Sequence, residues 1–264
     1  MTFRLLAPVV FVAFLVDAAG LTSTQPQVDY GDFVYETEDP GHIKMIFNAT
    51  KDGKGRFYIE CTGGKYEDAW FPLRKTPNPV IMHEFPYNKG VVPARLQKWH
   101  REIQKLCPYI KGDRYDLWLW YVHPNGNLET KFNDASISLE RQWLSMSTGT
   151  YKTNTSDLKL EAIVTKGGLI DVKISCKEGD TGCFLYGLRR SGPYERYKLS
   201  TLPDGKTVKD LVDKFQKTCP RYAHFFNEQK LETVGFATPN MVFGPPVFIY
   251  NRLYRQSAWC IPQQ

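Results

Sequence analysis

Two stretches decide the fold: TKDGKGRFYIEC at residues 50–61 and TKGGLIDVKISC at residues 165–176. Thr, Lys, Gly, Ile and Cys recur in identical register, and both stretches end in a cysteine, Cys61 and Cys176. Two shorter matches follow in the same order, residues 104–108 with 216–220 and residues 128–130 with 231–233. A period far above the roughly 20 to 50 residues of solenoid repeats indicates tandem domains, each with its own core. The sequence therefore predicts a duplicated domain.

Each half has the same predicted order of elements: strands, one amphipathic helix and a hairpin. The helices are expected over residues 93–107 and 207–219, because apolar residues recur there at helical spacing. Their apolar stripes are Leu96, Trp99, Ile103 and Leu106, and Val208, Leu211, Val212 and Phe215. The fold class that follows is α+β: two tandem repeats, each an antiparallel sheet with one helix disulfide-linked to it.

Strands are expected at 43–47, 56–61, 70–73, 80–85 and 115–123, with Asn125-Gly126 as a hairpin turn before 127–132. Pro72, Pro77 and Pro79 restrict 70–73 and 80–85 to edges or loops. In the second half, residues 222–226, 230–236 and 247–255 are expected as strands. The predicted division is a signal peptide at 1–20, an extended N-terminal arm at 21–40, repeat domain 1 at 41–135, a linker at 136–156, and repeat domain 2 with a C-terminal strand extension at 157–264.

The N-terminal residues indicate export. Arg4 precedes an apolar run at 5–16 that is too short to span a bilayer, and Ala18-Ala19-Gly20 offers a small-residue cleavage site. No later stretch is apolar for long enough to cross a membrane. We expect a secreted, extracellular protein.

The cysteines of an exported chain are expected to form disulfides. Equivalence of the two halves predicts the pairs Cys61–Cys107 and Cys176–Cys219, and leaves Cys183 to pair with Cys260. A free thiol or a bond between the two domains is the alternative. Asn48 and Asn154 begin acceptor sequences for N-linked glycan.

The charge of +6 is mild and both signs are interspersed, so an ordinary surface is favoured over a nucleic-acid footprint. The sequence contains no zinc-protease, serine-hydrolase, phosphate-loop or dinucleotide motif. No cofactor and no metal are expected. The remaining catalytic candidates are His83, Glu84, His100 and His123, which have the residue types of metal-free phosphodiester cleavage. No histidine is duplicated in the second half, so only one half could be active. A structural role is favoured for each histidine, because residue types without known positions are weak indicators of a site.

Two aromatic stretches are candidate binding surfaces. Trp118 and Trp120 alternate within 115–123, where a central strand buried on both faces is favoured over a stacking platform. In the tail, Tyr250, Arg252 and Tyr254 alternate along one strand face and present the residue types enriched at interfaces. A plain edge strand is the alternative there.

These features favour a secreted, disulfide-bonded binding protein, an effector or immune-modulating factor that contacts an extracellular or host protein. In outline the chain resembles secreted effectors of pathogens or parasites, through its signal peptide, paired cysteines and missing catalytic motifs. The alternative is a secreted ribonuclease-like enzyme or a degenerate copy of one. An extracellular matrix component is a second alternative, disfavoured because low-complexity tracts are missing.

Overall fold

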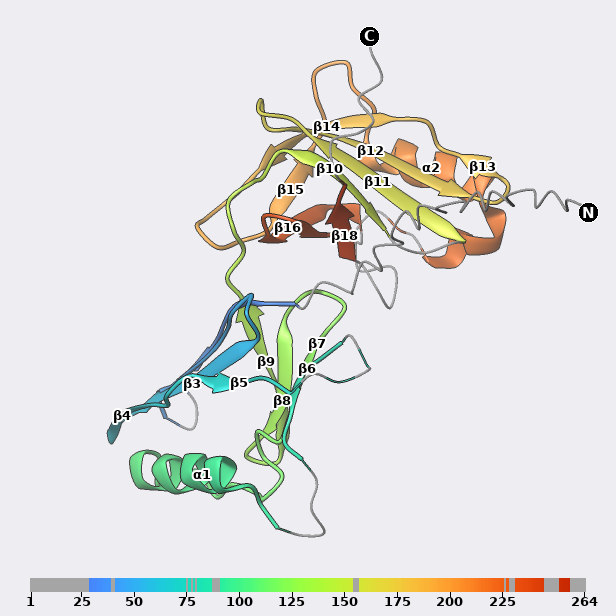
Figure 1. Ribbon diagram of the computed structural model, residues 1–264. Coiled ribbons are helices and arrows are strands. Elements are labelled where there is room, and N and C mark those ends of the chain that lie inside the picture. Colours follow the sequence, from blue (N-terminus) through green and yellow to red (C-terminus); the bar gives the residue numbers. More distant parts are fainter. Residues whose placement is uncertain are drawn as a thin grey trace, which may run out of the picture.

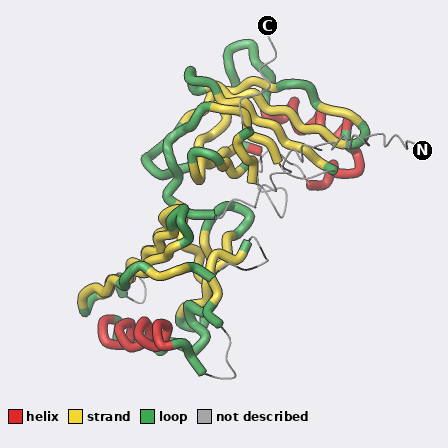
Figure 2. Tube along the Cα trace, viewed as in Figure 1, coloured by secondary structure: helices red, strands yellow, loops and turns green. Residues whose placement is uncertain are grey.

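The computed structural model describes residues 29–38, 41–74, 76, 78, 80–86, 91–153, 157–225, 227, 231–244 and 252–256. Two sheet-built halves lie end to end, each with one helix (Figure 1). Strands dominate both halves, and the helices occupy only one side of each (Figure 2). All strand pairs are antiparallel. Among the described residues, no helix has the length and apolarity that a membrane crossing requires.

The first sheet is nine-stranded and open. Its order is β4-β3-β2-β1-β9-β8-β7-β6, and β5 pairs with β3 beside this path. The strands are β1 Gly31–Thr37, β2 Ile43–Ala49, β3 Lys54–Cys61, β4 Gly64–Glu67, β5 Phe71–Pro72, β6 Ile81–Glu84, β7 Leu119–Val122, β8 Leu128–Phe132 and β9 Ala135–Arg141.

The second sheet is also nine-stranded, with the order β11-β10-β18-β17-β16-β15-β14-β12-β13. The sheet is closed into a barrel, because β11 also pairs with β12 and β14 pairs with β15. The strands are β10 Gly149–Thr153, β11 Leu158–Val164, β12 Leu169–Cys176, β13 Gly179–Asp180, β14 Phe184–Arg189, β15 Tyr197–Ser200, β16 Thr233–Thr238, β17 Met241–Phe243 and β18 Arg252–Arg255. The predicted antiparallel sheet with one helix is present in this half, but its closure into a barrel was not predicted, because sequence periodicity does not reveal that a sheet closes on itself.

The two halves have the same strand pairings with one exception. Matched in chain order, β1 to β9 correspond to β10 to β18, and each pairing of the first half recurs in the second. The exception is the pairing of β14 with β15, which has no counterpart between β5 and β6. The first half is thus an opened form of the barrel in the second, which supports the predicted duplication.

The helices α1 (Ala94–Leu106) and α2 (Val208–Thr218) lie where the sequence predicts them. The predicted stripe of α1 is buried in full, and Leu211, Val212 and Phe215 of α2 are buried. Proline precedes α1 without a side-chain cap, whereas Thr207 and Asp210 form a capping box on α2. In each half, a strand and the residue that ends the helix carry a disulfide, Cys61–Cys107 and Cys176–Cys219. Both bonds are as predicted.

The core of the first half continues across the junction into the second. Ala237, Met241 and Phe243 belong to the same buried cluster as Phe33 and Trp120. Two junction groups hold the halves together and are described next.

Asp29, just before β1, bridges two buried arginines from different halves. Its Oδ1 accepts from Nη2 of Arg141 at 2.8 Å, and its Oδ2 accepts from Nη2 of Arg252 at 2.9 Å. Arg141 also donates to the carbonyl oxygens of Gly126 and Tyr30. Burial of a charged network with satisfied donors fixes one arrangement of the two halves.

Trp143 is the second junction group and is 5 % exposed. It lies between two glycines, one from each half. A Cβ on Gly126 or on Gly235 would lie 2.4 Å from an atom of the Trp143 ring. The ring therefore needs glycine at both positions.

Several predicted boundaries differ from the structure. The predicted arm at 21–40 contains β1, and the predicted linker at 136–156 contains most of β9 and all of β10. Residues 222–226 were expected as a strand, but Pro220–Phe225 form the 3-10 helix η1. The match of 128–130 with 231–233 joins non-equivalent strands, because Thr130 lies in the second strand after its helix and Thr233 in the first. Short local matches do not reveal these long-range pairings.

Candidate functional site

The four predicted catalytic candidates do not form one site. His83 and Glu84 lie on β6, His100 on α1, and His123 just after β7. Within the described part of the chain, no hydrogen bond or ring contact joins any two of them. Each histidine has its own partners, given below.

His83 is buried, with 4 % exposure, and its ring lies between Phe71 and Phe85. Its Nδ1 accepts from the backbone N–H of Arg74 at 3.1 Å. Burial, together with the charges of Arg74 and Arg95, lowers the pKa of His83 to about 4. A neutral, enclosed imidazole of this kind supports the structural interpretation.

His123 is half exposed, and its Nδ1 accepts from the backbone N–H of Asn125 at 3.3 Å. Its Nε2 lies 3.9 Å from Oε1 of Glu129. These contacts place His123 in the hairpin turn. Neither His123 nor these two partners line a pocket of the described chain.

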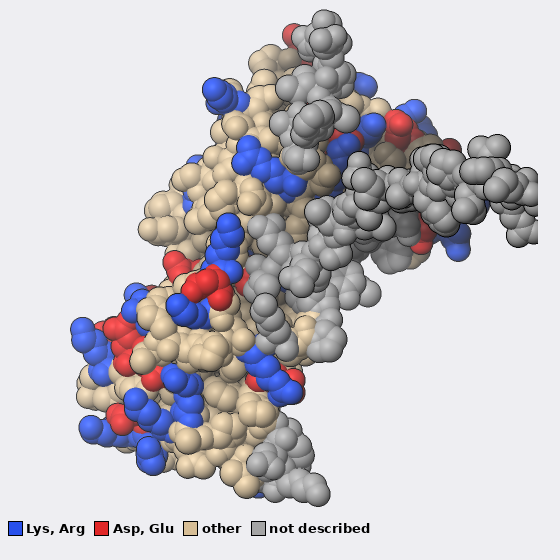
Figure 3. Space-filling view, viewed as in Figure 1, with Lys and Arg blue, Asp and Glu red and all other residues tan. Residues whose placement is uncertain are grey.

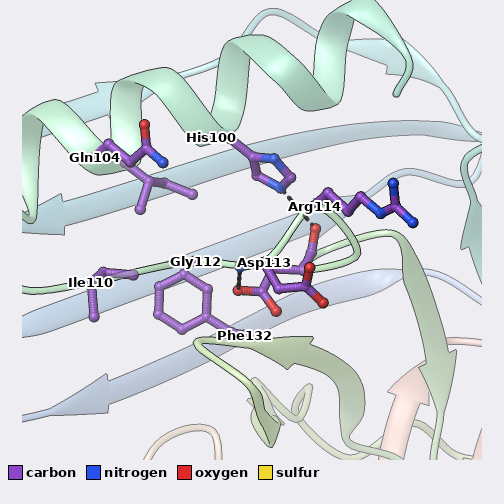
Figure 4. A pocket seen from close by; sticks show the side chains of 9 residues that line it. His100, Gln104, Ile110, Gly112, Asp113, Arg114 and Phe132 are labelled. Carbon is purple, nitrogen blue, oxygen red and sulfur yellow. Dashed lines mark hydrogen bonds between the residues drawn. The ribbon is translucent and has the colours of Figure 1, made fainter. Parts of the chain in front are cut away.

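His100 is the one candidate that lines a pocket. The pocket has a volume of about 210 Å³ and lies between α1, residues 110–116 and the end of β8. His100 and Gln104 project from α1 toward this loop, and Ile110 and Phe132 lie on the other side (Figure 4). The volume is below the roughly 300–1,000 Å³ of drug-sized sites, so it suits a smaller molecule.

Asp116 gives this pocket its chemistry. It lines the pocket and is 2 % exposed. Its Oδ2 accepts from the backbone N–H groups of Asp113 and Asn133, at 2.9 and 2.8 Å. Its Oδ1 is buried and accepts from no group of the described chain. A buried carboxylate oxygen without a donor is costly, so it requires an explanation.

The neighbouring charges leave Asp116 without a cation. Lys131 is paired with Asp113 at 2.8 Å and with Asp134 at 2.9 Å. Arg114 donates to the hydroxyl of Tyr115 at 2.7 Å and lies over its ring. Within the described chain, no Lys or Arg forms an ion pair with Asp116.

The backbone around Asp116 is held in an unusual conformation. The next residue, Leu117, is fully buried and has a φ of 60°, a region that costs a non-glycine residue roughly 1–2 kcal/mol. His100 donates from Nε2 to the carbonyl oxygen of Asp116 at 3.0 Å, and the N–H of Leu117 donates to the carbonyl of Lys131. The turn occupies the first residues of the apolar run, so β7 begins only at Leu119 and the expected strand over 115–123 is wrong in its first half.

The predicted tail surface is placed differently from the expectation. Arg252 is 6 % exposed and paired with Asp29, so it does not belong to an exposed face. Tyr254 is half buried against the core of the first half. Tyr250 lies outside the described residues. β18 is moreover an interior strand of the barrel, between β10 and β17, and therefore not the plain edge strand of the alternative.

The remaining predicted positions are as follows. Asn48 lies in β2, half buried, and its Nδ2 donates to Oδ1 of Asp32 at 2.6 Å. Asn154 and Cys260 lie outside the described residues, so the glycan site and the bond Cys183–Cys260 stay predictions. Cys183 is exposed and unpaired among the described cysteines. The described residues include no group of three or more His, Cys, Asp or Glu side chains suited to a metal ion.

No protein-family model, no curated protein and no solved structure matches this chain. The interpretation of the candidate site therefore depends only on the geometry described above.

Sequence reasoning did not identify Asp116 as a site residue. The available signal was its position, a lone acid at the head of the apolar run DLWLWYV and three residues after Asp113. The junction residues Asp29 and Arg141 carried no comparable signal, since they are far apart in sequence.

Proposed function

We propose that this protein is an extracellular binding protein that holds a small ligand in the pocket beside α1 and performs no catalytic step. The observation that carries the proposal is a pocket of about 210 Å³ whose lining combines buried apolar side chains with the polar residues His100, Asp113 and Asp116. Two disulfides are typical of an oxidising compartment, which supports the extracellular setting.

The surface and the histidines support binding more than catalysis. On the face visible in Figure 3, basic and acidic side chains alternate over the lower half, with no single-sign patch there. Catalysis by general acid and base needs groups within reach of one reacting atom. His83, His100 and His123 have separate partners, so they do not favour the ribonuclease alternative. The burial of Arg252 also weakens the hypothesis that the tail contacts a host protein, because this side chain is not exposed to a partner.

The test uses the mature chain with three probes on one skeleton: phenylpropylamine, phenylpropanol and phenylpropionate. Gln104 is exposed on α1 and lines the pocket, so Gln104→Trp fills the pocket without touching the core. We expect at least one probe to bind wild type by isothermal calorimetry and Gln104→Trp to abolish that binding. Lys105→Trp, one position further on the exposed face, is the matched control.

Absence of binding by all three probes would overturn the proposal. Binding that persists in Gln104→Trp would also overturn it, because the site would lie elsewhere. RNA hydrolysis by wild type that is lost in His100→Ala would replace it with the nuclease function.

A further inference from the structure

We infer that the pocket ligand is a neutral, hydroxylated compound with a small apolar body, and that Gln104 and Asp113 hold it through hydrogen bonds to its hydroxyl group. The inference rests on the proposed function, because it names the ligand class of the same pocket. It follows from three features of the lining: which polar side chains a ligand can reach, how their charges balance, and where the apolar side chains lie.

The polar side chains of the lining differ in whether a ligand can reach them. Gln104 and Arg114 are exposed, and the side chain of Asp113 is 31 % exposed. Asp116 acts indirectly. Its Oδ1 is enclosed by protein, whereas its Oδ2 accepts from the N–H of Asp113 and so fixes the backbone at that residue. A ligand in the pocket therefore meets Gln104, Asp113 and Arg114, and does not contact the carboxylate of Asp116.

The charges within reach of the ligand cancel. Asp113 carries one negative charge, Arg114 carries one positive charge, and Gln104 is neutral. Both charged groups also have partners in the chain, because Asp113 is paired with Lys131 at 2.8 Å and Arg114 donates to the Tyr115 hydroxyl at 2.7 Å. A charged ligand group would be attracted by one of the two and repelled by the other, so its loss of water on binding is not offset. This balance favours a neutral ligand.

The same side chains offer both hydrogen-bond donors and acceptors. The carboxylate of Asp113 only accepts, the guanidinium of Arg114 only donates, and the amide of Gln104 does both. A hydroxyl group also donates and accepts, so it can donate to Asp113 and accept from Gln104. An ether oxygen cannot donate and leaves Asp113 without a new partner. The lining therefore suits a hydroxyl group better than an ether.

The apolar side chains lie apart from this polar group. In Figure 4, Ile110 and Phe132 lie at one end of the pocket and Arg114 lies at the other, with Asp113 between them. Ile110 and Phe132 are each 4 % exposed and form an apolar wall. Ligand sites commonly combine such a wall with a few polar groups that orient the ligand. The arrangement suits a molecule with an apolar body at one end and a hydroxyl group at the other.

The experiment extends the series of probes by one compound, the methyl ether of phenylpropanol, which keeps the oxygen but has no hydroxyl donor. Affinities are measured for wild type by isothermal calorimetry. Phenylpropanol should bind about fivefold or more tightly than phenylpropylamine, phenylpropionate and the methyl ether. The first two comparisons test the neutral charge of the ligand, and the third tests the hydroxyl group.

The chain offers a matched pair of variants. Asp113 and Asp134 both pair with Lys131, but of these two acids Asp113 alone lines the pocket. Asp113→Ala should lower the affinity for phenylpropanol about fivefold or more and remove its advantage over the methyl ether, whereas Asp134→Ala should stay within about twofold of wild type. Circular dichroism and the melting temperature check that both variants fold.

The outcomes separate this inference from the proposed function. If the amine or the acid binds wild type as tightly as the alcohol and Gln104→Trp abolishes that binding, the pocket is a ligand site but the neutral ligand class is wrong. If the alcohol and its methyl ether bind equally, the hydroxyl group is not recognised. If Asp113→Ala keeps the advantage of the alcohol, Asp113 is not its partner. If no probe binds, the proposed function fails as well. The wild-type comparisons decide the ligand class even if Asp113→Ala does not fold.

Discussion

The two repeats have the same strand order but differ in one strand pairing. In the second repeat, β14 pairs with β15 through Gly187, Leu188 and Arg189, which completes the barrel. In the first, β5 has two residues and ends at Pro72, which has no N–H to donate to a further strand. One backbone-to-side-chain hydrogen bond spans this gap instead: the backbone N–H of Arg74 donates to Nδ1 of His83 on β6.

The two repeats also differ in the cavities that they contain. Inside the closed barrel, the apolar cavity measures about 20 Å³, little more than one water molecule needs. In the opened repeat, the pocket beside α1 measures about 210 Å³. Val212 occupies the position in α2 that corresponds to His100 in α1, and it is buried. The second repeat nevertheless has a polar pocket of its own at the start of α2, of about 390 Å³ and lined by Lys198, Thr207 and Glu232 among others. The two repeats therefore differ in the residues that line the pocket beside the helix.

The largest expected effect concerns the coupling of the two repeats. Asp29→Asn leaves Arg141 and Arg252 buried without an anion, which should cost about 3–5 kcal/mol of unfolding free energy. We expect urea unfolding, followed by circular dichroism and tryptophan fluorescence, to separate into two transitions. Asp32→Asn, on the exposed face of β1, should stay within about 0.5 kcal/mol of wild type. One unshifted transition in Asp29→Asn would show that the repeats do not depend on this bridge.

The second effect is a pH dependence specific to the opened repeat. The pKa of His83 is about 4 in the folded protein and 6.5 is its ordinary value, so the unfolded chain binds a proton first as the pH falls. Stability from this group is complete above about pH 6.5 and should decline by up to roughly 3 kcal/mol as the pH falls to about 4. Urea midpoints measured across this range test the expectation.

His83→Gln is the matched variant, because glutamine keeps an acceptor for the Arg74 N–H but does not titrate. Its urea midpoint should fall less steeply between pH 6.5 and 4 than that of wild type. His123→Gln, at a half-exposed position, should retain the wild-type slope. If the urea midpoints of wild type and His83→Gln fell equally steeply with pH, His83 would not be the source of the pH dependence.

The smallest expected effect compares the helix starts. Thr207→Ala removes the capping box of α2 and should cost about 1 kcal/mol, whereas Pro93→Ala removes no side-chain cap from α1 and should change stability by less. Thermal unfolding of both variants measures the difference. An equal loss in the two variants would mean that the cap has no separate contribution.

The sequence predicted what depends on local pattern. Helical spacing identified α1 with its buried residues, and the duplicated cysteines identified both described bonds. It did not predict the closed ring, because the pairing of β14 with β15 depends on partners that periodicity does not specify. It also assigned β1 and β10 to an arm and a linker. Asp116 was missed because its importance comes from Asn133 and the pocket wall, which only the fold brings near.

The setting of Trp143 between Gly126 and Gly235 has a consequence for how the molecule moves in solution. A ring held against backbone on both sides leaves no room for a hinge at this position. The two halves should therefore tumble as one body, and amide relaxation should give a single rotational correlation time for both. A ligand held beside α1 would then keep a fixed distance and orientation to the barrel.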